Sequence, residues 1–457
     1  MTRPAAVRRS AAHGLLGMLF ATSALVAVPS APVLQAVVSY DGVLAAATGV
    51  RVVTSLPTLR MAVVRADARA LRRLAAAAGV RGIAPDDAVA LAGDGDSLGK
   101  AVLASEGLGG SAGRNGAGAG VRIAVVDTGV SDTTALNRTS GRLVDAADSS
   151  HDGAVQTGGT YTDGYGHGTF MANVIAGGAV EGTRGRALGV APGATVLVVR
   201  VARPDGTTSL SKVLAGLDWV AAHRGSVDIV NLSLSHARPA RAYGADPLTD
   251  AVDRVRDSGI TVVVSSGNTK NTVSDPGFDP RVLTVGAADL STGRLAAFSG
   301  SDVVAGVAKP DVVASGVDVL GLLPAGSVLA QAPTTKHLAD GLYRGSGTSQ
   351  AAAVTSGLAA LLLAAHPGAT PAQVKASIRC AARQLSGRRD GAGLVRTTTT
   401  VCAAADGRAL DGSRDATGES SFNASSWGAS SWGASSWAAS SWGASSWAAS
   451  SWAGGTS

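Results

Sequence analysis

Aromatic and charged residues are scarce in this chain, at 4% and 16% of its 457 residues, whereas hydrophobic residues make up 46%. This length and composition exclude a disordered protein, and they allow a sizeable core and more than one domain. Sixty glycines, with abundant alanine and valine, indicate a tightly packed α/β protein with many turns.

The chain also lacks a basic stripe interleaved with aromatic residues. Its formal net charge is +6, but Arg3, Arg8 and Arg9, in a first stretch of 36 residues without any acid, supply +3 of it. The remaining charge is spread thinly along the chain, as on a solvated surface. We therefore predict no nucleic-acid partner.

The N-terminus has no apolar run long enough for an ordinary membrane span. It has a basic stretch (MTRPAAVRRS), a short apolar segment (GLLGMLFATSALVAV) and small residues up to position 36. These are the three parts of a secretory signal. We predict a signal peptide over residues 1–36 and a secreted protein; the alternative is a first core helix.

Cysteine occurs only twice, at Cys380 and Cys402. Two thiols with no histidine nearby make a poor metal site. Because an exported chain can keep thiols oxidised, we predict a disulfide between Cys380 and Cys402 and no metal site. The carboxylates show no recognisable calcium-loop spacing, so the sequence leaves structural calcium open.

The pattern of apolar residues divides the chain into segments. Residues 50–91 are predicted to form a strand, a helix and a strand, a small α+β unit within a domain of residues 37–96. The segment at 107–120 is rich in Gly, Ser and Asn, and we predict that it is an exposed linker.

From residue 121, apolar strands alternate with helical segments. Continuous Val and Ile runs indicate strands buried on both faces, which is typical of a parallel sheet covered by helices. The strands read VRIAVVDTG, ATVLVVRVA, VDIVNLSLS, GITVVVSSGN and RVLTVGAAD. Ligands bind beyond the carboxyl ends of such strands, so the polar residues that end them are where we expect chemistry.

The tail, residues 405–457, is a low-complexity Ser, Ala and Trp repeat. Its tryptophans recur every five residues from Trp427 to Trp452. Neither a helix nor a strand collects this spacing on one side, so the rings should be exposed. We expect the tail either to contact a cell envelope or glycan, or to be a spacer without a partner.

Three polar residues stand at the ends of predicted strands or the starts of predicted helices. Asp127 ends the strand of IAVVDTGV, His167 lies in DGYGHGTFMANVIAG, and Ser349 lies in GSGTSQAAAVTSG. Singly, Asp127 could be a turn residue or a nucleotide-ribose acceptor, and His167 and Ser349 helix caps. Jointly, they are the carboxylate, base and nucleophile of a catalytic triad.

Residues 97–404 contain the motifs VVDTGV, GHGT and GTSQAAA and the strands GVAPGATVLVVRV and VDIVNLSLS. In these segments the chain resembles the subtilisin-like serine proteases. The resemblance implies a three-layer α/β fold with a mostly parallel central sheet and helices on both faces. It also implies a small α+β propeptide, residues 37–96, that aids folding and inhibits the enzyme.

The resemblance also assigns roles to single residues. Asp127 would orient the imidazole, His167 would act as general base and then acid, and Ser349 would attack the carbonyl carbon. Asn268, in VVVSSGN, would hold the oxyanion together with the backbone N–H of Ser349. Without the other motifs, Asn268 would be read as a turn residue.

An extended substrate is expected to lie along NLSLS, with the S1 pocket beside it. The residues implied are Ser233, Leu234, Ser235, Ser265, Ser266, Gly267 and Ser274. Ser235 and Ser274 stand where the family usually has glycine, which should narrow the pocket. The Asp275-Pro276 bond aligns with a cis-proline bend.

The sequence departs from the family pattern at three positions near the triad. Phe170 replaces a second histidine, Gln350 replaces the usual methionine after the nucleophile, and Ala353 replaces a proline. None of these changes removes a catalytic group, but each bears on specificity and loop geometry.

We therefore predict a secreted serine endopeptidase that is made as a self-processing precursor. Its partners would be polypeptide substrates and its own propeptide, and its chemistry would need no cofactor. A second hypothesis is a catalytically silent surface-binding protein, against which the filled catalytic positions argue. A third, a nucleotide-binding enzyme, lacks a Gly-rich phosphate turn, since DTGVSD has one glycine.

Overall fold

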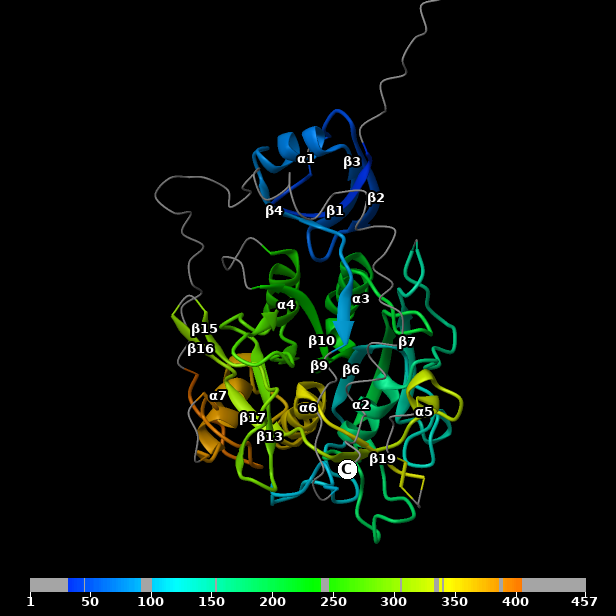
Figure 1. Ribbon diagram of the computed structural model, residues 1–457, viewed down its shortest axis with the longest axis vertical. Coiled ribbons are helices and arrows are strands. Elements are labelled where there is room, and N and C mark those ends of the chain that lie inside the picture. Colours follow the sequence, from blue (N-terminus) through cyan, green and yellow to red (C-terminus); the bar gives the residue numbers. More distant parts are fainter. Residues whose placement is uncertain are drawn as a thin grey trace, which may run out of the picture. The chain divides into compact units, whose positions relative to one another are not determined.

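The computed structural model (Figure 1) describes residues 32–404, apart from short gaps. The gaps are residues 45, 92–100, 153, 240–245, 305, 333–336, 339–340 and 386–388. The predicted signal peptide, except for its last residues, and the Trp-rich tail lie outside the described residues. Both therefore stay predictions.

The first described unit is a four-stranded antiparallel sheet with the order β2-β3-β1-β4. One helix, α1 (Ala68–Ala75), buries Leu71 and Leu74 against this sheet, and the Asp67 side chain caps its start. The strands are β1 (Leu34–Tyr40), β2 (Val50–Leu56), β3 (Met61–Ala66) and β4 (Val80–Pro85). The α+β character agrees with the sequence prediction.

Two details of this unit differ from the sequence prediction. The stretch read as one strand is a hairpin of β2 and β3, because a turn bonds Arg60 N–H to the Pro57 carbonyl and holds Arg60 at a φ of 51°. In addition, β1 begins at Leu34 in the interior of the sheet, two residues before the boundary predicted at residue 36.

A mostly parallel sheet forms the larger unit, in the order β14-β13-β11-β9-β6-β8-β7, with β17 also paired to β13. All of its pairs are parallel except that of β13 with β14. The strands are β6 (Arg122–Asp127), β7 (Leu143–Asp148), β8 (Thr195–Arg200), β9 (Ile229–Leu232), β11 (Thr261–Ser265), β13 (Leu283–Asp289), β14 (Arg294–Leu295) and β17 (Val312–Ser315). The predicted parallel sheet is confirmed.

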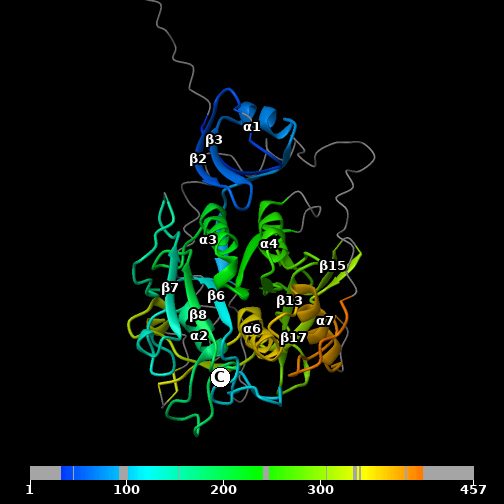
Figure 2. The same cartoon turned by 180° about the vertical axis from the view of Figure 1, so that it is seen from behind.

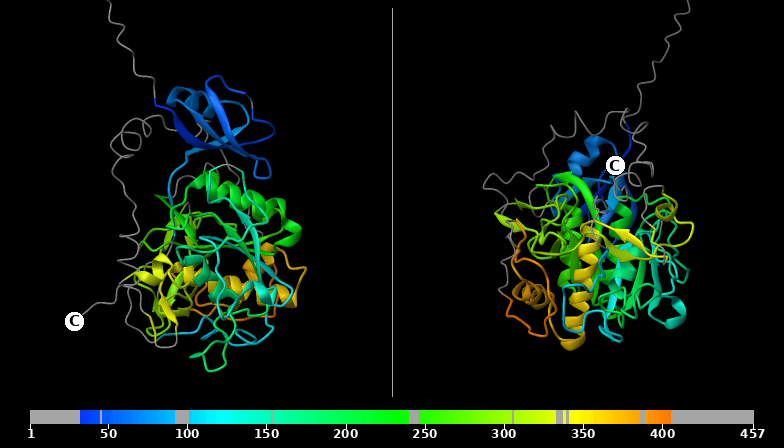
Figure 3. Two further views of the ribbon diagram at one scale, coloured as in Figure 1. Left: turned by 90° about the vertical axis from the view of Figure 1, so that its right-hand side faces the viewer. Right: turned by 60° about the horizontal axis from the view of Figure 1, so that its bottom comes forward.

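Helices cover both faces of this sheet (Figures 1 and 2). On one face lie α3 (Leu210–Ala222) and α4 (Pro247–Asp257), and on the other α2 (His167–Ala176) and α6 (Thr348–Ala365). The α6 helix, yellow to orange in Figure 3, is long and apolar enough to cross a membrane, but its side chains are buried in the core. The C-terminal helix α7 (Pro371–Ala381) packs beside it. This is the predicted three-layer arrangement.

A short strand connects the two units. It is β5 (Val89–Leu91), which pairs antiparallel with β10 (Leu234–Pro239) in a three-stranded sheet completed by β12 (Ser274–Asp275). Side chains add to this contact. Asp218 on α3 accepts the Leu59 N–H at 2.8 Å, and Arg81 donates to Asp250 on α4 at 3.1 Å.

The Gly-rich segment 107–120 was predicted to be an exposed linker, and most of its residues are exposed, but it also packs against the larger unit. Leu108 is buried, and the Gly113 N–H donates to the Val190 carbonyl at 2.8 Å. A Cβ on Gly118 would lie 2.8 Å from the Ala191 side chain. Glycine is used here for close packing as well as for turns, a distinction that composition does not reveal.

Cys380 and Cys402 are free thiols in the structure. The neighbouring Cys380 thiol raises the pKa of Cys402, so the two side chains lie near each other. The Cys402 N–H also donates to the Ser377 hydroxyl of α7 at 2.9 Å. The disulfide therefore stays a prediction.

One buried carboxylate binds the ammonium groups of two lysines at the edge of the core. Asp311 accepts from Nζ of Lys309 at 2.8 Å and from Nζ of Lys375 at 2.9 Å. The Thr284 N–H donates to it at 2.9 Å. Burial lowers the pKa of Lys375 to about 7 although Asp311 opposes this effect. The cluster joins β13, β17 and α7.

We predict that Asp311→Asn lowers the free energy of unfolding by roughly 3–5 kcal/mol, because it leaves two buried ammonium groups without a counter-charge. Denaturant unfolding of the chain carrying Ser349→Ala, which removes the predicted nucleophile, would measure the loss. The control is Asp289→Asn, at a partly exposed carboxylate that ends β13 and accepts from Ser291, and its loss should stay within about 1 kcal/mol. Equal losses in the two variants would contradict the prediction.

Candidate active site

Asp127 and His167 meet where β6 ends and α2 begins. Nδ1 of His167 lies 2.8 and 2.9 Å from the two carboxylate oxygens of Asp127, and both side chains are buried. The Thr128 N–H also donates to Asp127 at 2.8 Å. This fixes the imidazole with Nδ1 toward the carboxylate and Nε2 away from it.

Glycine allows this approach. A Cβ on Gly168 would collide with the Gly129 carbonyl oxygen and lie 3.1 Å from Cβ of Asp127. Gly129 and Gly166 have φ values of 103° and 114°, which favour glycine. The glycines around His167 therefore bring the start of α2 against the loop that follows Asp127.

The electrostatics of the pair favour a charged imidazole. Burial lowers the pKa of His167, but the charge of Asp127, the hydrogen bond to it and the charge of Asp163 together raise that pKa above its ordinary value. Nε2 is buried and has no hydrogen-bond partner among the described residues. It is therefore the ring atom placed to exchange a proton.

Ser349 is the second residue of α6 and is fully buried. Its hydroxyl donates to the Ser233 carbonyl at 3.3 Å, and the Ser233 hydroxyl donates in return to the Ser349 carbonyl at 3.3 Å. Because α6 begins at Thr348, the positive end of its dipole lies beside this hydroxyl.

Asn268 is fixed by a residue that sequence reasoning missed. Its Oδ1 accepts from Thr348 twice, from N–H at 2.9 Å and from Oγ1 at 2.8 Å. Because Oδ1 is engaged, Nδ2 is the end of the amide that could donate to an oxyanion. Thr348 directly precedes Ser349, so the position of Asn268 is coupled to that of Ser349.

The predicted substrate-binding residues lie on neighbouring segments. Leu234 and Ser235 are on β10, where they pair with Leu91 and Ala90. The Ser274 N–H donates to the Ser266 carbonyl at 3.0 Å, and a Cβ on Gly267 would collide with the Ser274 hydroxyl. Ser265 ends β11, and Ser233 lies between β9 and β10.

The three departures from the family pattern are all buried. The Phe170 ring lies against Gly321, where a Cβ would approach it to 2.7 Å. Ala353 is inside α6. Gln350 has a buried Oε1 with no hydrogen-bond partner among the residues that the structure describes. The Asp275-Pro276 bond is cis, as the alignment implied.

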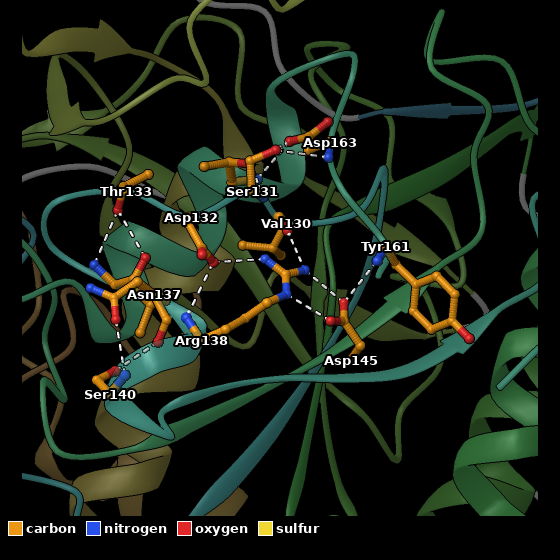
Figure 4. Close-up of polar contacts among 12 residues, drawn as sticks. Val130, Ser131, Asp132, Thr133, Asn137, Arg138, Ser140, Asp145, Tyr161 and Asp163 are labelled. Atoms are coloured by element: carbon orange, nitrogen blue, oxygen red, sulfur yellow. Dashed lines mark hydrogen bonds and ion pairs between the residues drawn. The ribbon is translucent and has the colours of Figure 1, made fainter. Parts of the chain in front are cut away.

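A polar network that the sequence did not indicate fastens the loop after Asp127 (Figure 4). Arg138 donates to Asp145 at 2.6 Å, to Asp132 at 2.7 Å and to the Val130 carbonyl at 2.9 Å. Asp145 also accepts the Tyr161 N–H at 2.9 Å. The network ties this loop to β7 and to the segment that leads to His167.

No group of three His, Cys, Asp or Glu side chains within the described ranges is arranged to hold a metal ion. The site described above consists of side chains and backbone groups alone. Its chemical capability is proton exchange at Nε2, attack by a hydroxyl and donation of hydrogen bonds from an amide.

Comparison with known proteins identifies the class to which this fold and site belong. Residues 118–408 match the Subtilase family, and the chain belongs to that family. It is 32% identical to serine protease AprX of Bacillus subtilis over 57% of this chain and 62% of that protein. The chain thus spans about three fifths of this relative.

Two further similarities agree with the family. Subtilisin BL of Lederbergia lenta is 33% identical over 61% of this chain and 89% of its own length. A crystal structure of fervidolysin from Fervidobacterium pennivorans, described as a keratinolytic enzyme related to subtilisin, superposes with a TM-score of 0.63 at 24% identity. That match covers 80% of this chain and 60% of fervidolysin, and it supports the fold.

We predict that Asn268→Ala lowers kcat for a chromogenic peptide by roughly 10² to 10³ with little change in KM, the magnitude known for the corresponding donor in subtilisin. Thr348→Val keeps the amide but removes one of the bonds that orient it, and should give a smaller loss of kcat. A change confined to KM would mean that Asn268 only shapes the binding pocket.

Proposed function

We propose that the protein is a secreted serine endopeptidase that acts through Asp127, His167 and Ser349. The observation that carries the proposal is the buried pair of Asp127 and His167 at 2.8 Å, with an unpartnered Nε2 among the described residues. The hydroxyl of Ser349 at the start of α6 and membership of the subtilase family support it.

The proposed reaction requires the Ser349 hydroxyl, which donates to the Ser233 carbonyl in the structure, to turn toward Nε2 of His167. Nε2 of His167 accepts the proton of Ser349 as Oγ attacks the carbonyl carbon, and Asp127 stabilises the resulting imidazolium. The Ser349 N–H and Nδ2 of Asn268 donate to the oxyanion. His167 then protonates the leaving amine, and water releases the acyl group from Ser349 by the same steps.

We further propose that substrates bind as an extended strand along β10. The support is β5, which already pairs there with the residues Leu234 and Ser235. Main-chain pairing of this kind gives affinity with broad tolerance of sequence. Ser235 and Ser274, in place of glycines, should favour a small side chain in the S1 pocket.

Residues 37–96 would then be an inhibitory propeptide. This role is supported by the pairing of β5 with β10, which leaves no room for a substrate strand. Two hydrogen bonds to α3 add to it: Asp218 accepts the Leu59 N–H at 2.8 Å, and the Ser211 N–H donates to Asp86 at 2.7 Å.

The register of β5 suggests where the precursor cuts itself. Leu91 pairs with Leu234, and the Ser349 hydroxyl contacts the carbonyl of the preceding residue, Ser233. The antiparallel pairing brings the end of β5 close to the residue that contacts Ser349, so we expect the cut to fall beyond β5, between about residues 92 and 115.

Export would also allow Cys380 and Cys402, whose thiols lie near each other, to form the predicted disulfide. The bond would fasten the last described segment to α7. The competing hypothesis, a catalytically silent binding protein, is disfavoured because each catalytic position carries the reactive residue type.

We predict that Ser349→Ala abolishes peptide hydrolysis and leaves a precursor that still carries residues 37 to about 95, because one nucleophile would perform both reactions. Mass spectrometry of the exported protein would show both ends of the chain. The control is Ser356→Ala, which removes a buried hydroxyl from the same helix away from the triad. Normal processing of the Ser349→Ala precursor in a host without other proteases would contradict the proposal.

We also propose that the Trp repeats contact a cell envelope or glycan, since exposed indole rings are amphipathic stacking surfaces. Deletion of residues 412–457 should leave hydrolysis of a small peptide near normal and reduce binding to isolated envelopes. Equal binding of full-length and truncated protein would assign the tail as a spacer.

A further inference from the structure

A second buried carboxylate lies beside the Asp127 and His167 pair. Asp163 is four residues before His167 and is 3% exposed. It accepts five hydrogen bonds, which fill the acceptor sites of both its oxygens. The donors are the Thr128 hydroxyl at 2.8 Å, the Tyr165 N–H at 3.1 Å, the Gly166 N–H at 2.7 Å, and the Thr169 N–H and hydroxyl, both at 2.8 Å.

These donors come from the two segments that must meet for the pair to form. Thr128 directly follows Asp127, to which it donates its N–H, and its hydroxyl accepts the Gly168 N–H at 2.9 Å. Gly166 and Thr169 flank His167 at the start of α2. Asp163 therefore clamps the end of β6 to the first turn of α2.

A second set of contacts closes the same clamp from the other side. The Asp163 N–H donates to the Ser131 hydroxyl at 3.0 Å, and the Ser131 N–H donates to the Thr169 hydroxyl at 3.0 Å. Figure 4 shows Ser131 and Asp163 together at the edge of the loop network. The clamp thus continues into the loop that Arg138 fastens.

The charge of Asp163 is not cancelled by a cation in these contacts, because all five donors are neutral groups. Burial raises the pKa of Asp163, and the hydrogen bonds oppose that rise. Since every contact is a donor, the geometry fits the ionised carboxylate. Its negative charge acts on His167 together with that of Asp127.

We propose that Asp163 is a positioning residue for the triad: it holds Asp127 and His167 in register through Thr128 and the first turn of α2, and its charge stabilises the imidazolium that forms during the reaction. This inference rests on the proposed function, since it assigns Asp163 a part in the same hydrolysis. Asp163 touches neither substrate nor the reacting atoms.

Asp163→Asn is the direct test, because it keeps the shape of the side chain but removes the charge and one acceptor. We expect kcat per active site, counted with a serine-reactive phosphonate, to fall roughly tenfold to hundredfold, with KM within about twofold. The acid limb of the profile of kcat/KM against pH should move to lower pH. The reason is that the imidazolium loses a stabilising negative charge.

Asp145→Asn is the matched control. Asp145 is a carboxylate of the same loop network and accepts from Arg138 and the Tyr161 N–H. Among the residues that the structure describes, Asp145 makes no hydrogen bond to Thr128 or to α2, so its loss should loosen the loop without moving the acid limb. If both variants lose activity equally and neither moves the acid limb, Asp163 has only a structural role and the proposal is wrong.

Thr128→Val separates the positioning effect of Asp163 from the effect of its charge. It also tests the proposal if Asp163→Asn does not fold. It removes the tie between Asp163 and the end of β6 but keeps the carboxylate. We expect a lower kcat with an unmoved acid limb, and recovery in Thr128→Ser. An unchanged kcat in Thr128→Val would contradict the proposal that Asp163 positions the end of β6 through Thr128. Hydrolysis by Ser349→Ala would instead overturn the proposed function, so the two failures are distinguishable.

Discussion

The rest of the site depends on one close approach, that of the first turn of α2 to the loop after β6. Asp127 and His167 meet at 2.8 Å only because Gly168 has no Cβ to strike the Gly129 carbonyl. A parallel sheet brings the end of β6 to the edge at which α2 starts, but it does not set this separation. The glycines and the hydrogen bonds of Thr128 set it.

Charge is buried in two different ways in this protein. The negative charge of Asp311 is compensated by the ammonium groups of Lys309 and Lys375. These contacts and the Thr284 N–H link β13 and α7 to the residues just before β17. Asp127 and Asp163 have one imidazole between them and otherwise rely on neutral donors. The first arrangement sets two lysines against one carboxylate. The second sets two carboxylates against one imidazole, so a proton on that imidazole reduces the net negative charge of the group.

The edge of β10 has a comparable double use in the proposed function. A strand edge offers the same backbone groups to any extended chain, so the segment that inhibits the precursor and the substrate that replaces it compete for Leu234 and Ser235. In the structure, β5 occupies them. Because β5 belongs to the same chain as β10, it competes with a high effective concentration. Contacts of α3 and α4 with the N-terminal unit add to its binding.

The sequence by itself determined the class of fold, the strand end that carries Asp127 and the helix starts that carry His167 and Ser349, because buried parallel strands and apolar helices leave local patterns. It did not reveal the hairpin of β2 and β3 or the packing of residues 107–120, since turn geometry and close contact leave no compositional signal. Thr348 and Asp163 were missed for a related reason. Their roles arise from hydrogen bonds to Asn268 and Thr128, 80 and 35 residues away, and only the tertiary structure decides which distant donors and acceptors meet.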